Sequence, residues 1–394
     1  MDSKFFLVGS KKLVKKTLNP FDDIICDFFD SLSQDIFKKK KIFNDSDILT
    51  LGFWLRKKNI LKLKNSFYDE EFKRPLGIVF HITPNNVPIN FAYSLFFGLI
   101  TGNTNIVKVP SKKYLQVEYL CQSINNLLKI KKFNILKEMI NIIRYENDDK
   151  ITEEISKKSN ARIIWGGDQT VKKIKNISAP IKCVDITFPD RYSFSVVNLE
   201  VLKNLNNLNF LNFVKKFYTD NYTFDQNACN SSHLVFWIGK KKDKKLIDKF
   251  WIELNSYVTK KVDYPETVST DKYNKICTDL IYFSNIKKLK IYSKSLHVVT
   301  LNKLIPKNEL QRGQWGYFYQ YLSNDISILP KIITEKYQTL SYFGLDPDFF
   351  KKFIQKNEIR GIDRIVPIGR SMEMNYLWDG YNLLRALTRI IDIK

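Results

Sequence analysis

The stretch from Leu76 to Val109 decides the fold: LGIVFHITPNNVPINFAYSLFFGLITGNTNIVKV. Its first part, residues 76–82, is apolar, rich in β-branched residues and bounded by prolines, which is typical of a buried strand. Residues 87–99 have the apolar pattern of a helix, and residues 105–109 read as a second strand. Because a helix connects two strands, the stretch predicts a βαβ unit with a parallel sheet.

The same alternation continues on both sides of this stretch. We expect helices within residues 1–70, a helix over 113–128, strands over 160–165 and 193–197, a second α/β mixture over 200–365, and a strand near 366–369 followed by a final helix over 377–391. A chain of 394 residues is also too long for one ordinary core. The sequence therefore predicts two large α/β domains.

Composition excludes several classes of protein. Hydrophobic residues make up 44% of the chain, which is enough for packed cores and excludes a largely disordered chain. No run of about 18 uncharged apolar residues occurs, so we expect no membrane span. The five cysteines lie far apart and the first residues lack the apolar region of a signal peptide. We therefore expect reduced thiols in a cytoplasmic protein.

The formal net charge of +23 allows two interpretations. A basic surface is typical of proteins that bind nucleic acids or membrane surfaces. Lysines are nevertheless spread along the whole chain, and their runs lack interleaved aromatic residues, which favours a purely compositional origin. We therefore expect no nucleic-acid partner, although a basic surface still attracts acidic ligands.

Several chemical motifs are missing from the sequence. The patterns GxGxxG, GxxxxGK[ST] and GxSxG do not occur, so the usual dinucleotide fingerprint, the P-loop and the hydrolase elbow are excluded. The three histidines, His81, His233 and His297, are scattered, and we expect no metal site.

Two candidate segments follow the strands of the opening stretch. In Thr83-Pro84-Asn85-Asn86-Val87-Pro88, prolines fix the backbone around Asn86, which suits an amide that must point at one place; the alternative is an ordinary turn in which Asn caps the helix. In Lys108-Val109-Pro110-Ser111-Lys112, the first lysine ends a strand, where open α/β sheets bind ligands; the alternative is a surface lysine.

A third candidate segment is Asp225-Gln226-Asn227-Ala228-Cys229, a cysteine in a polar stretch. We expect Cys229 near the N-terminus of a helix, where the helix dipole lowers the pKa of a thiol. The alternative is a structural cysteine.

In type and order, these segments resemble the aldehyde dehydrogenase superfamily and, within it, the LuxC-like acyl-CoA reductase family. The superfamily's Pro-x-Asn-x-Pro turn, strand-end Lys-Pro-Ser, glycine turn and cysteine segment resemble residues 84–88, 108–111, 165–167 and 226–229. The narrower family is indicated by QNACNSS at 226–232, GIDRIVPIGR at 361–370 and WDGY at 378–381.

The resemblance implies an aldehyde-dehydrogenase-like α/β fold, in which two open-sheet α/β domains have the active site in the cleft between them. We predict an N-terminal helical segment with a nicotinamide cofactor-binding domain over 1–205 and a catalytic domain with the nucleophilic cysteine over 206–365. Residues 366–394 are predicted as a strand–helix segment that packs back on the body.

The resemblance also implies reduction of a fatty acyl thioester, acyl-CoA or acyl-protein, to the aldehyde through an acyl-cysteine. Cys229 is the expected nucleophile, and Asn86 the expected donor to the oxyanion. Cofactor binding is expected from Thr83, Pro84, Lys108, Ser111, Lys112, Gly166 and Gly167. NADPH is the expected cofactor, with NADH as the alternative, because no carboxylate follows Lys108. An acyl-activating synthetase and further copies of the chain are the implied partners.

The sequence departs from the superfamily near residue 185. The Glu-Leu-Gly-Gly segment, whose glutamate activates water, is missing there, and only Asp185 and Asp190 are present. We therefore expect slow hydrolysis of the acyl-enzyme. Glu335 and Gln338 are alternatives for the residue that binds the nicotinamide ribose, and His233 either assists the thiol or is structural. Another aldehyde-dehydrogenase-type oxidoreductase, a nucleic-acid-binding protein and a non-catalytic scaffold are the alternative functions.

Overall fold

The structure is a computed structural model that describes residues 5–10, 15–39, 46–67, 71–146 and 148–394. The chain forms two compact units, one of Met1–Asp190 with Met374–Lys394 and one of Arg191–Glu373. These bounds differ from the predicted ones at residues 205 and 365. The first difference arises because residues 192–198 form a strand of the second unit's sheet, so the chain leaves the first unit before them.

The first unit is built on a six-stranded sheet. Its strands, in spatial order, are β1 (Phe6–Val8), β5 (Ile140–Ile143), β4 (Thr104–Lys108), β3 (Ile78–Ile82), β6 (Ala161–Trp165) and β7 (Val184–Phe188). All neighbouring strands are parallel except β1, which is antiparallel to β5. The strands predicted over 76–82, 105–109 and 160–165 are confirmed as β3, β4 and β6.

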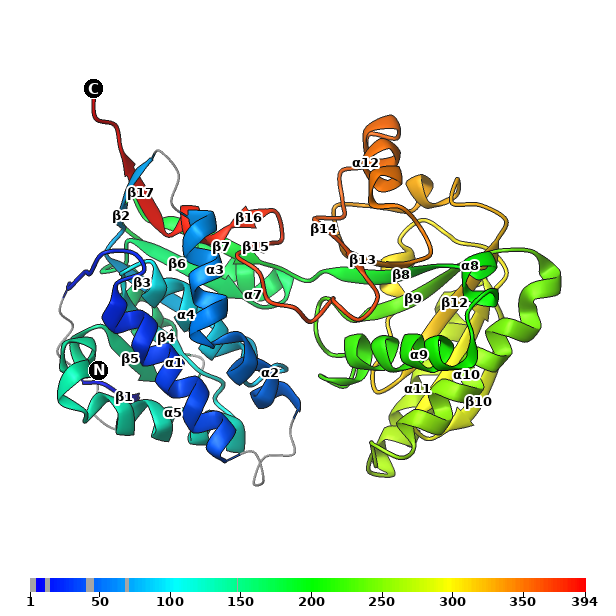
Figure 1. Cartoon of the computed structure of the whole chain (residues 1–394), viewed down its shortest axis with the longest axis horizontal. Helices are drawn as coiled ribbons and strands as arrows, with labels where there is room; N and C mark the ends of the chain where they lie inside the picture. The colour runs from blue at the N-terminus through cyan, green and yellow to red at the C-terminus, as the bar shows by residue number, and fades with distance from the viewer. Residues whose placement is uncertain (1–4, 11–14, 40–45, 68–70, 147) are drawn as a thin grey trace. The chain divides into compact units, whose positions relative to one another are not determined.

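Helices surround this sheet. They are α1 (Asp23–Lys38), α2 (Ser46–Trp54), α3 (Lys57–Phe67), α4 (Asn90–Ile100), α5 (Leu115–Leu128), α6 (Asp149–Ser156), α7 (Asp168–Lys175) and the short α13 (Leu383–Ala386). Helix α1 packs against α2, α3, α4 and α5, so these helices form one layer (Figure 1). The side chains of α4 after Asn90 are all buried, which explains why its sequence is apolar on every face.

A hydrogen-bonded network of buried polar side chains lies between α4 and the sheet. His81 Nε2 donates to Asn105 Oδ1 at 2.9 Å, and its Nδ1 lies 2.7 Å from Ser94 Oγ. Trp165 Nε1 donates to the same Ser94 Oγ at 3.2 Å. Gly98 leaves space for this network, because a Cβ atom at Gly98 would lie 1.9 Å from Asn105 Oδ1. His81 is therefore a structural residue that joins β3, β4 and α4.

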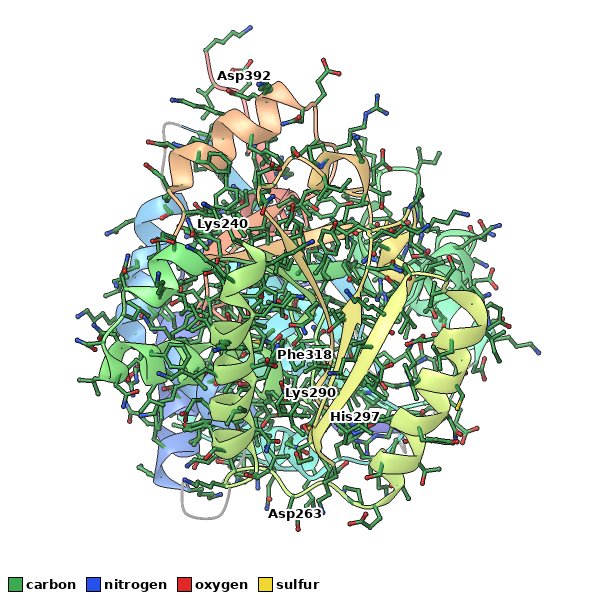
Figure 2. All side chains as sticks on the ribbon, turned by 90° about the vertical axis from the view of Figure 1, so that its right-hand side faces the viewer. Lys240, Asp263, Lys290, His297, Phe318 and Asp392 are labelled. Carbon is green, nitrogen blue, oxygen red and sulfur yellow. The ribbon has the colours of Figure 1, made fainter. Side chains whose placement is uncertain are left out.

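The second unit is built on a seven-stranded sheet. Its strands, in spatial order, are β10 (Ile286–Ser293), β11 (Leu296–Leu301), β12 (Tyr317–Ser323), β9 (Ser232–Ile238), β8 (Tyr192–Asn198), β13 (Tyr337–Phe343) and β14 (Arg364–Pro367). Only the β10–β11 pair is antiparallel among them. Figure 2 labels Lys290 on β10, His297 on the neighbouring β11 and Phe318 on β12.

Helices and two cores complete the second unit. The helices are α8 (Leu199–Lys203), α9 (Asn207–Tyr222), α10 (Lys244–Val258), α11 (Thr267–Tyr282) and α12 (Pro347–Lys356). Aromatic residues of α9 and α10 pack on one set of strand residues, including Trp237 and Phe318. Phe350 and Phe353 of α12 pack on the alternate set, including Phe194 and Phe236. The sheet is therefore buried on both faces, as parallel sheets usually are.

The prediction of a final helix over 377–391 is wrong. The segment forms the hairpin strands β15 (Leu377–Trp378) and β16 (Tyr381–Asn382), then α13 and β17 (Thr388–Ile391). Asp379 and Gly380 connect the hairpin with φ angles of 47° and 76°, values that a right-handed helix excludes. Strand β17 pairs antiparallel with β2 (Phe72–Pro75), whose backbone groups it satisfies. The strand that pairs with β17 is therefore distant from it in the sequence.

Candidate active site

The predicted cofactor residues of the first unit lie at one edge of its sheet. Strand β3 pairs in parallel with both β4 and β6, so the segments that follow these three strands leave the sheet at the same edge. Thr83 and Pro84 follow β3, Lys108 ends β4, and Gly166 follows β6. The strand order reverses at β3, which is where open α/β sheets bind ligands.

Thr83 and Lys108 are in direct contact. The Thr83 hydroxyl donates to the Lys108 carbonyl at 2.7 Å and is largely buried. The Lys108 ammonium lies 4.5 Å from the centre of the Tyr145 ring. Burial lowers the pKa of Lys108 below its usual value, and the charge of Lys173 acts in the same direction. Ser111 and Lys112 are exposed in the loop that follows.

The glycine turn opens helix α7. Gly167 is the N-cap residue, no side chain caps the helix, and a Cβ atom at Gly167 would meet nothing within 4 Å. The first backbone N–H groups of α7 therefore lie beside an exposed glycine without a side chain. This arrangement is compatible with the negative charge of a dinucleotide phosphate.

Asn86 lies in an exposed turn between β3 and α4. The N-cap residue of α4 is Ile89, so Asn86 does not occupy the N-cap position. The alternative interpretation, in which Asn86 is an ordinary helix cap, is therefore wrong. A residue outside the turn stabilises it: the Tyr114 hydroxyl donates to the Asn85 carbonyl at 2.8 Å.

Cys229 lies in the turn between α9 and β9 of the second unit and is partly exposed. The expectation that it lies at a helix N-terminus is wrong, because a strand begins at Ser232. Asp225 and Gln226 have φ angles of 51° and 63°, and this left-handed backbone ends the helical path after α9. A helix dipole that favours the thiolate is therefore not available from the following element.

Two side chains fix the backbone on either side of Cys229. Gln226 is buried: its Nε2 donates to the carbonyls of Ser232 and Tyr317 at 2.9 and 3.1 Å. Its Oε1 accepts from the N–H groups of Gly316 and Tyr317 at 3.1 and 3.0 Å. The Ser193 hydroxyl donates to the Cys229 carbonyl at 2.6 Å.

Gln338 contacts the sulfur itself. It is the second residue of β13 and is buried, and its Nε2 donates to Cys229 Sγ at 3.3 Å. Sequence reasoning considered Gln338 only as an alternative ligand of the nicotinamide ribose and missed this contact. The signal in the sequence is weak: one glutamine inside the strand YQTLSYF.

A third group of contacts joins Asn230 to the turn after β14. Asn230 Nδ2 donates to the Ser371 carbonyl. The Arg364 guanidinium donates to the same carbonyl at 2.6 Å, to that of Glu373 at 2.6 Å and to that of Arg370 at 3.1 Å. The motif at 361–370 therefore lies beside the cysteine turn within the second unit.

Three of the other thiols are less suited to nucleophilic chemistry. Burial raises the pKa of Cys26 to about 11 and that of Cys121 to about 12, and it also raises the pKa of Cys183. His233 is buried too, and burial together with the charge of Arg312 lowers its pKa to about 3. A neutral imidazole is a poor source of positive charge for Cys229, which favours a structural role for His233.

Asp185 is one of the two carboxylates in the segment that lacks the superfamily's glutamate, and it is held in an ion pair. Arg162 donates to it from Nε and Nη2, both at 2.7 Å, and the Arg162 side chain is almost completely buried. The backbone N–H of Asp190 donates to Asp168 Oδ1 at 3.2 Å. Asp185 is therefore held on β7 by an ion pair with β6.

In the described part of the chain, no group of three His, Cys, Asp or Glu side chains is arranged to bind a metal ion. Within the same residues, no helix has the length and hydrophobicity needed to cross a membrane.

Comparison with solved structures defines the class of fold. A glyceraldehyde-3-phosphate dehydrogenase, GapN, from Methanocaldococcus jannaschii, complexed with NADP, matches with a TM-score of 0.64 and 15% identity, over 94% of this chain and 88% of that chain. An NAD-dependent benzaldehyde dehydrogenase from Corynebacterium glutamicum matches with a TM-score of 0.65 and 10% identity, over 99% and 98% of the two chains. The chain has the aldehyde dehydrogenase fold.

Comparison of sequences identifies the family. The family described as "Acyl-CoA reductase (LuxC)" matches residues 55–390, and the chain belongs to this family. Long-chain acyl-protein thioester reductases of Aliivibrio fischeri and Vibrio harveyi are 24% and 20% identical over 42% and 80% of this chain. The matches cover 33% and 63% of those relatives, so the chain spans less than two thirds of their length.

Proposed function

We propose that the chain reduces a fatty acyl thioester to the aldehyde, with NADPH as the reductant and Cys229 as the covalent nucleophile. The observation that carries the proposal is the partly exposed Cys229, in a turn fixed by Gln226 and Ser193, with Gln338 donating to its sulfur. The LuxC family and the names of its acyl-protein thioester reductase relatives support an acyl-protein or acyl-CoA substrate.

The first half of the reaction needs only the protein and the thioester. The Cys229 thiolate attacks the acyl carbonyl, and the Asn86 amide and the Cys229 backbone N–H stabilise the oxyanion. The bond to the carrier sulfur then breaks, which releases the carrier thiolate and leaves acyl-Cys229.

The second half returns the thiol to its starting state. A bound nicotinamide cofactor would supply the hydride that the acyl carbon needs. The hemithioacetal on Cys229 then collapses: its C–S bond breaks, the aldehyde leaves and the thiolate is regenerated. Both halves pass through a tetrahedral state with a negatively charged oxygen, so the donors proposed for the first state would also stabilise the second.

The cofactor fits the first unit. Gly167 and the uncapped N-terminus of α7 suit the phosphates, while Thr83, Pro84, Lys108, Ser111, Lys112 and Gly166 lie at or after the carboxyl ends of β3, β4 and β6. NADPH is favoured over NADH because lysines, and no carboxylate, follow β4 where a 2′-phosphate would bind. We assign cofactor binding to the first unit and the nucleophile to the second, with an acyl-activating synthetase and further copies of this chain as partners.

The test is a reduction assay with fatty acyl-CoAs of several lengths and with an acylated carrier protein, in which loss of NADPH or NADH and release of aldehyde are measured. We expect aldehyde formation with a higher kcat/KM for NADPH. A protein that oxidises neither cofactor with any thioester would contradict the proposal.

Replacing the nucleophile tests its assignment. Cys229→Ala should abolish turnover and acyl transfer to the protein while leaving NADPH binding unchanged, because the variant lacks the sulfur to which the acyl group is transferred. Labelled acyl-CoA followed by peptide mass mapping detects the acyl group, and Cys277→Ala, which removes an exposed thiol, is the matched control. Label on Cys26, Cys121, Cys183 or Cys277 instead would refute the role of Cys229.

A further inference from the structure

A cysteine nucleophile needs a source of positive charge or hydrogen bonds, because a free thiol is mostly protonated at neutral pH. The residues that follow Cys229 supply neither of two usual sources. The element that follows it is a strand, so no helix N-terminus faces it from that side. The buried His233, whose pKa falls to about 3, is neutral at physiological pH.

Arg364 is placed to supply this charge. It begins β14, which pairs with β13 so that Arg364 lies opposite Thr339, the neighbour of Gln338. Arg364 also shares the Ser371 carbonyl with Asn230, the residue after Cys229. Arg364 is therefore linked to the cysteine turn in two ways, through the pairing of its backbone with β13 and through the bonds of its guanidinium to the turn at 370–373.

We propose that Arg364 maintains Cys229 in its thiolate form and that Gln338 directs the sulfur, so that the nucleophile is activated without a histidine base. This inference rests on the proposed function, in which Cys229 attacks the thioester. Arg364 acts through space and through the turn, and is a positioning residue; Gln338 touches the reacting sulfur.

The electrostatic balance around Arg364 agrees with the proposal. Burial lowers the pKa of Arg364, while the charges of Glu373, Asp220 and Cys229 raise it, in that order. Because the interaction between two charges is mutual, a cation that gains from the thiolate also favours the thiolate. An arginine remains protonated at every physiological pH even after such a shift.

The other charged groups near Arg364 are partly neutralised. Glu373 forms an ion pair with Arg370, whose Nη2 lies 2.7 Å from Glu373 Oε2. Asp220 of α9 accepts from the backbone N–H groups of Gly369 and Ser371 at 2.6 and 3.0 Å. Burial raises the pKa of Asp220 to about 6, so its negative charge is partly lost just below neutrality.

The experiment measures how fast iodoacetamide alkylates Cys229 in the full chain at a series of pH values, with no substrate or cofactor present. Peptide mass spectrometry separates Cys229 from the other cysteines. In Arg364→Gln we expect the midpoint of the pH profile to rise by about one unit or more, the lower end of the effect of a nearby opposite charge. Arg364→Lys should restore a midpoint close to that of the wild-type protein.

Two further variants keep the test decisive. Arg360→Gln removes an exposed cation four residues before Arg364 and should leave the midpoint unchanged. Gln338→Glu places a negative charge against the sulfur and should raise the midpoint even if Arg364→Gln does not fold. A folded Arg364→Gln with a wild-type midpoint overturns the role of Arg364, and a Gln338→Glu without any shift overturns that of Gln338.

The alkylation result is independent of reductase activity. A wild-type midpoint in the variants together with NADPH-dependent aldehyde formation would contradict this inference and leave the proposed function intact. A shifted midpoint in a chain that reduces no thioester would contradict the proposed function and leave the activation of Cys229 by Arg364 standing.

Discussion

Asn86 lies in the turn before α4 and is not the N-cap residue of that helix, which is Ile89. We predict that Asn86→Ala lowers turnover by roughly 10²–10³-fold, which is the usual effect of losing one oxyanion donor. The KM for the thioester should change much less, because the contact strengthens only in the transition state. Steady-state kinetics test this, with Asn85→Ala as the neighbouring control; an unchanged kcat would show that Asn86 only shapes the turn.

The ion pair of Asp185 allows a prediction about the hydrolysis of acyl-Cys229 by water. Because both of its oxygens bind Arg162, Asp185 is not positioned as a base, and acyl-Cys229 should persist when NADPH is withheld. Mass spectrometry of the protein after mixing with acyl-CoA measures this accumulation. Rapid, repeated release of free fatty acid without cofactor would mean that another residue activates water.

The same ion pair has a structural role that a variant separates from catalysis. Asp185→Asn leaves the almost completely buried Arg162 without its counterion, which should lower the free energy of unfolding by about 3 kcal/mol. Hydrolysis of acyl-Cys229 should not change. Urea unfolding and release of fatty acid, measured on the same protein, distinguish the two roles.

At the scale of elements, the contact of α4 with β3 and β4 depends on Gly98. Alanine usually stabilises a helix by about 1 kcal/mol relative to glycine. In Gly98→Ala, however, the new Cβ would lie 1.9 Å from Asn105 Oδ1 and 2.8 Å from His81 Nε2. We therefore predict a net loss of about 1–3 kcal/mol in the free energy of unfolding.

The matched control for Gly98 is Gly167→Ala, where an added Cβ meets nothing within 4 Å. Because Gly167 is the N-cap residue of α7, where alanine is less favourable than glycine, urea unfolding of this variant should show a loss of less than about 1 kcal/mol. Equal stability of Gly98→Ala and wild type would show that α4 shifts away from the sheet at little cost.

Elements also show where sequence reasoning succeeds and where it fails. β3 and β4 were predictable because their apolar residues lie between prolines and glycines, and local signals were sufficient. The C-terminal helix was predicted wrongly because residues 388–391 pair with β2, more than 300 residues earlier, and no local pattern reveals that partner. The helix expected at Cys229 failed for a related reason: the left-handed backbone at Asp225 and Gln226 depends on hydrogen bonds to distant residues.

The residues of the candidate site also fall into two groups, those that the sequence indicated and those that only the fold reveals. Asn86, Lys108 and Cys229 were identified as candidates from short motifs, and their catalytic and binding roles stay predictions. Gln338 and Arg364 come close to the cysteine turn only because β13 pairs with β8 and β14 pairs with β13 in the folded sheet. Spacing along the chain does not contain that information.

For the whole molecule, three buried histidines predict loss of stability in mild acid. Burial lowers the pKa of His81 to about 4, of His233 to about 3 and of His297 to about 4, from an ordinary value of 6.5. Below pH 6.5 these histidines therefore bind protons in the unfolded chain but not in the folded chain. The stability present above that pH is lost as the pH falls toward 4, by at most about 1.4 kcal/mol per pH unit for each histidine.

Asp220 opposes this trend within the second unit. Its pKa is raised to about 6, so the folded state binds its proton first as the pH falls. The clearest test is therefore His81→Asn in the first unit: urea unfolding between about pH 7 and about pH 5 should depend less on pH in this variant than in the wild-type protein. An identical pH dependence would show that His81 is protonated inside the folded protein.

The insertion of Arg191–Glu373 between the two parts of the first unit has a consequence for the order of events at the ribosome. The second unit is continuous and is complete once residue 373 has been made. Strand β2 ends at Pro75, and its partner β17 begins at Thr388. At about 5–20 residues per second, β2 waits roughly 15–60 seconds for that partner. During this time its edge is open to other nascent chains, so slower translation lengthens the period in which the first unit is exposed to misassembly.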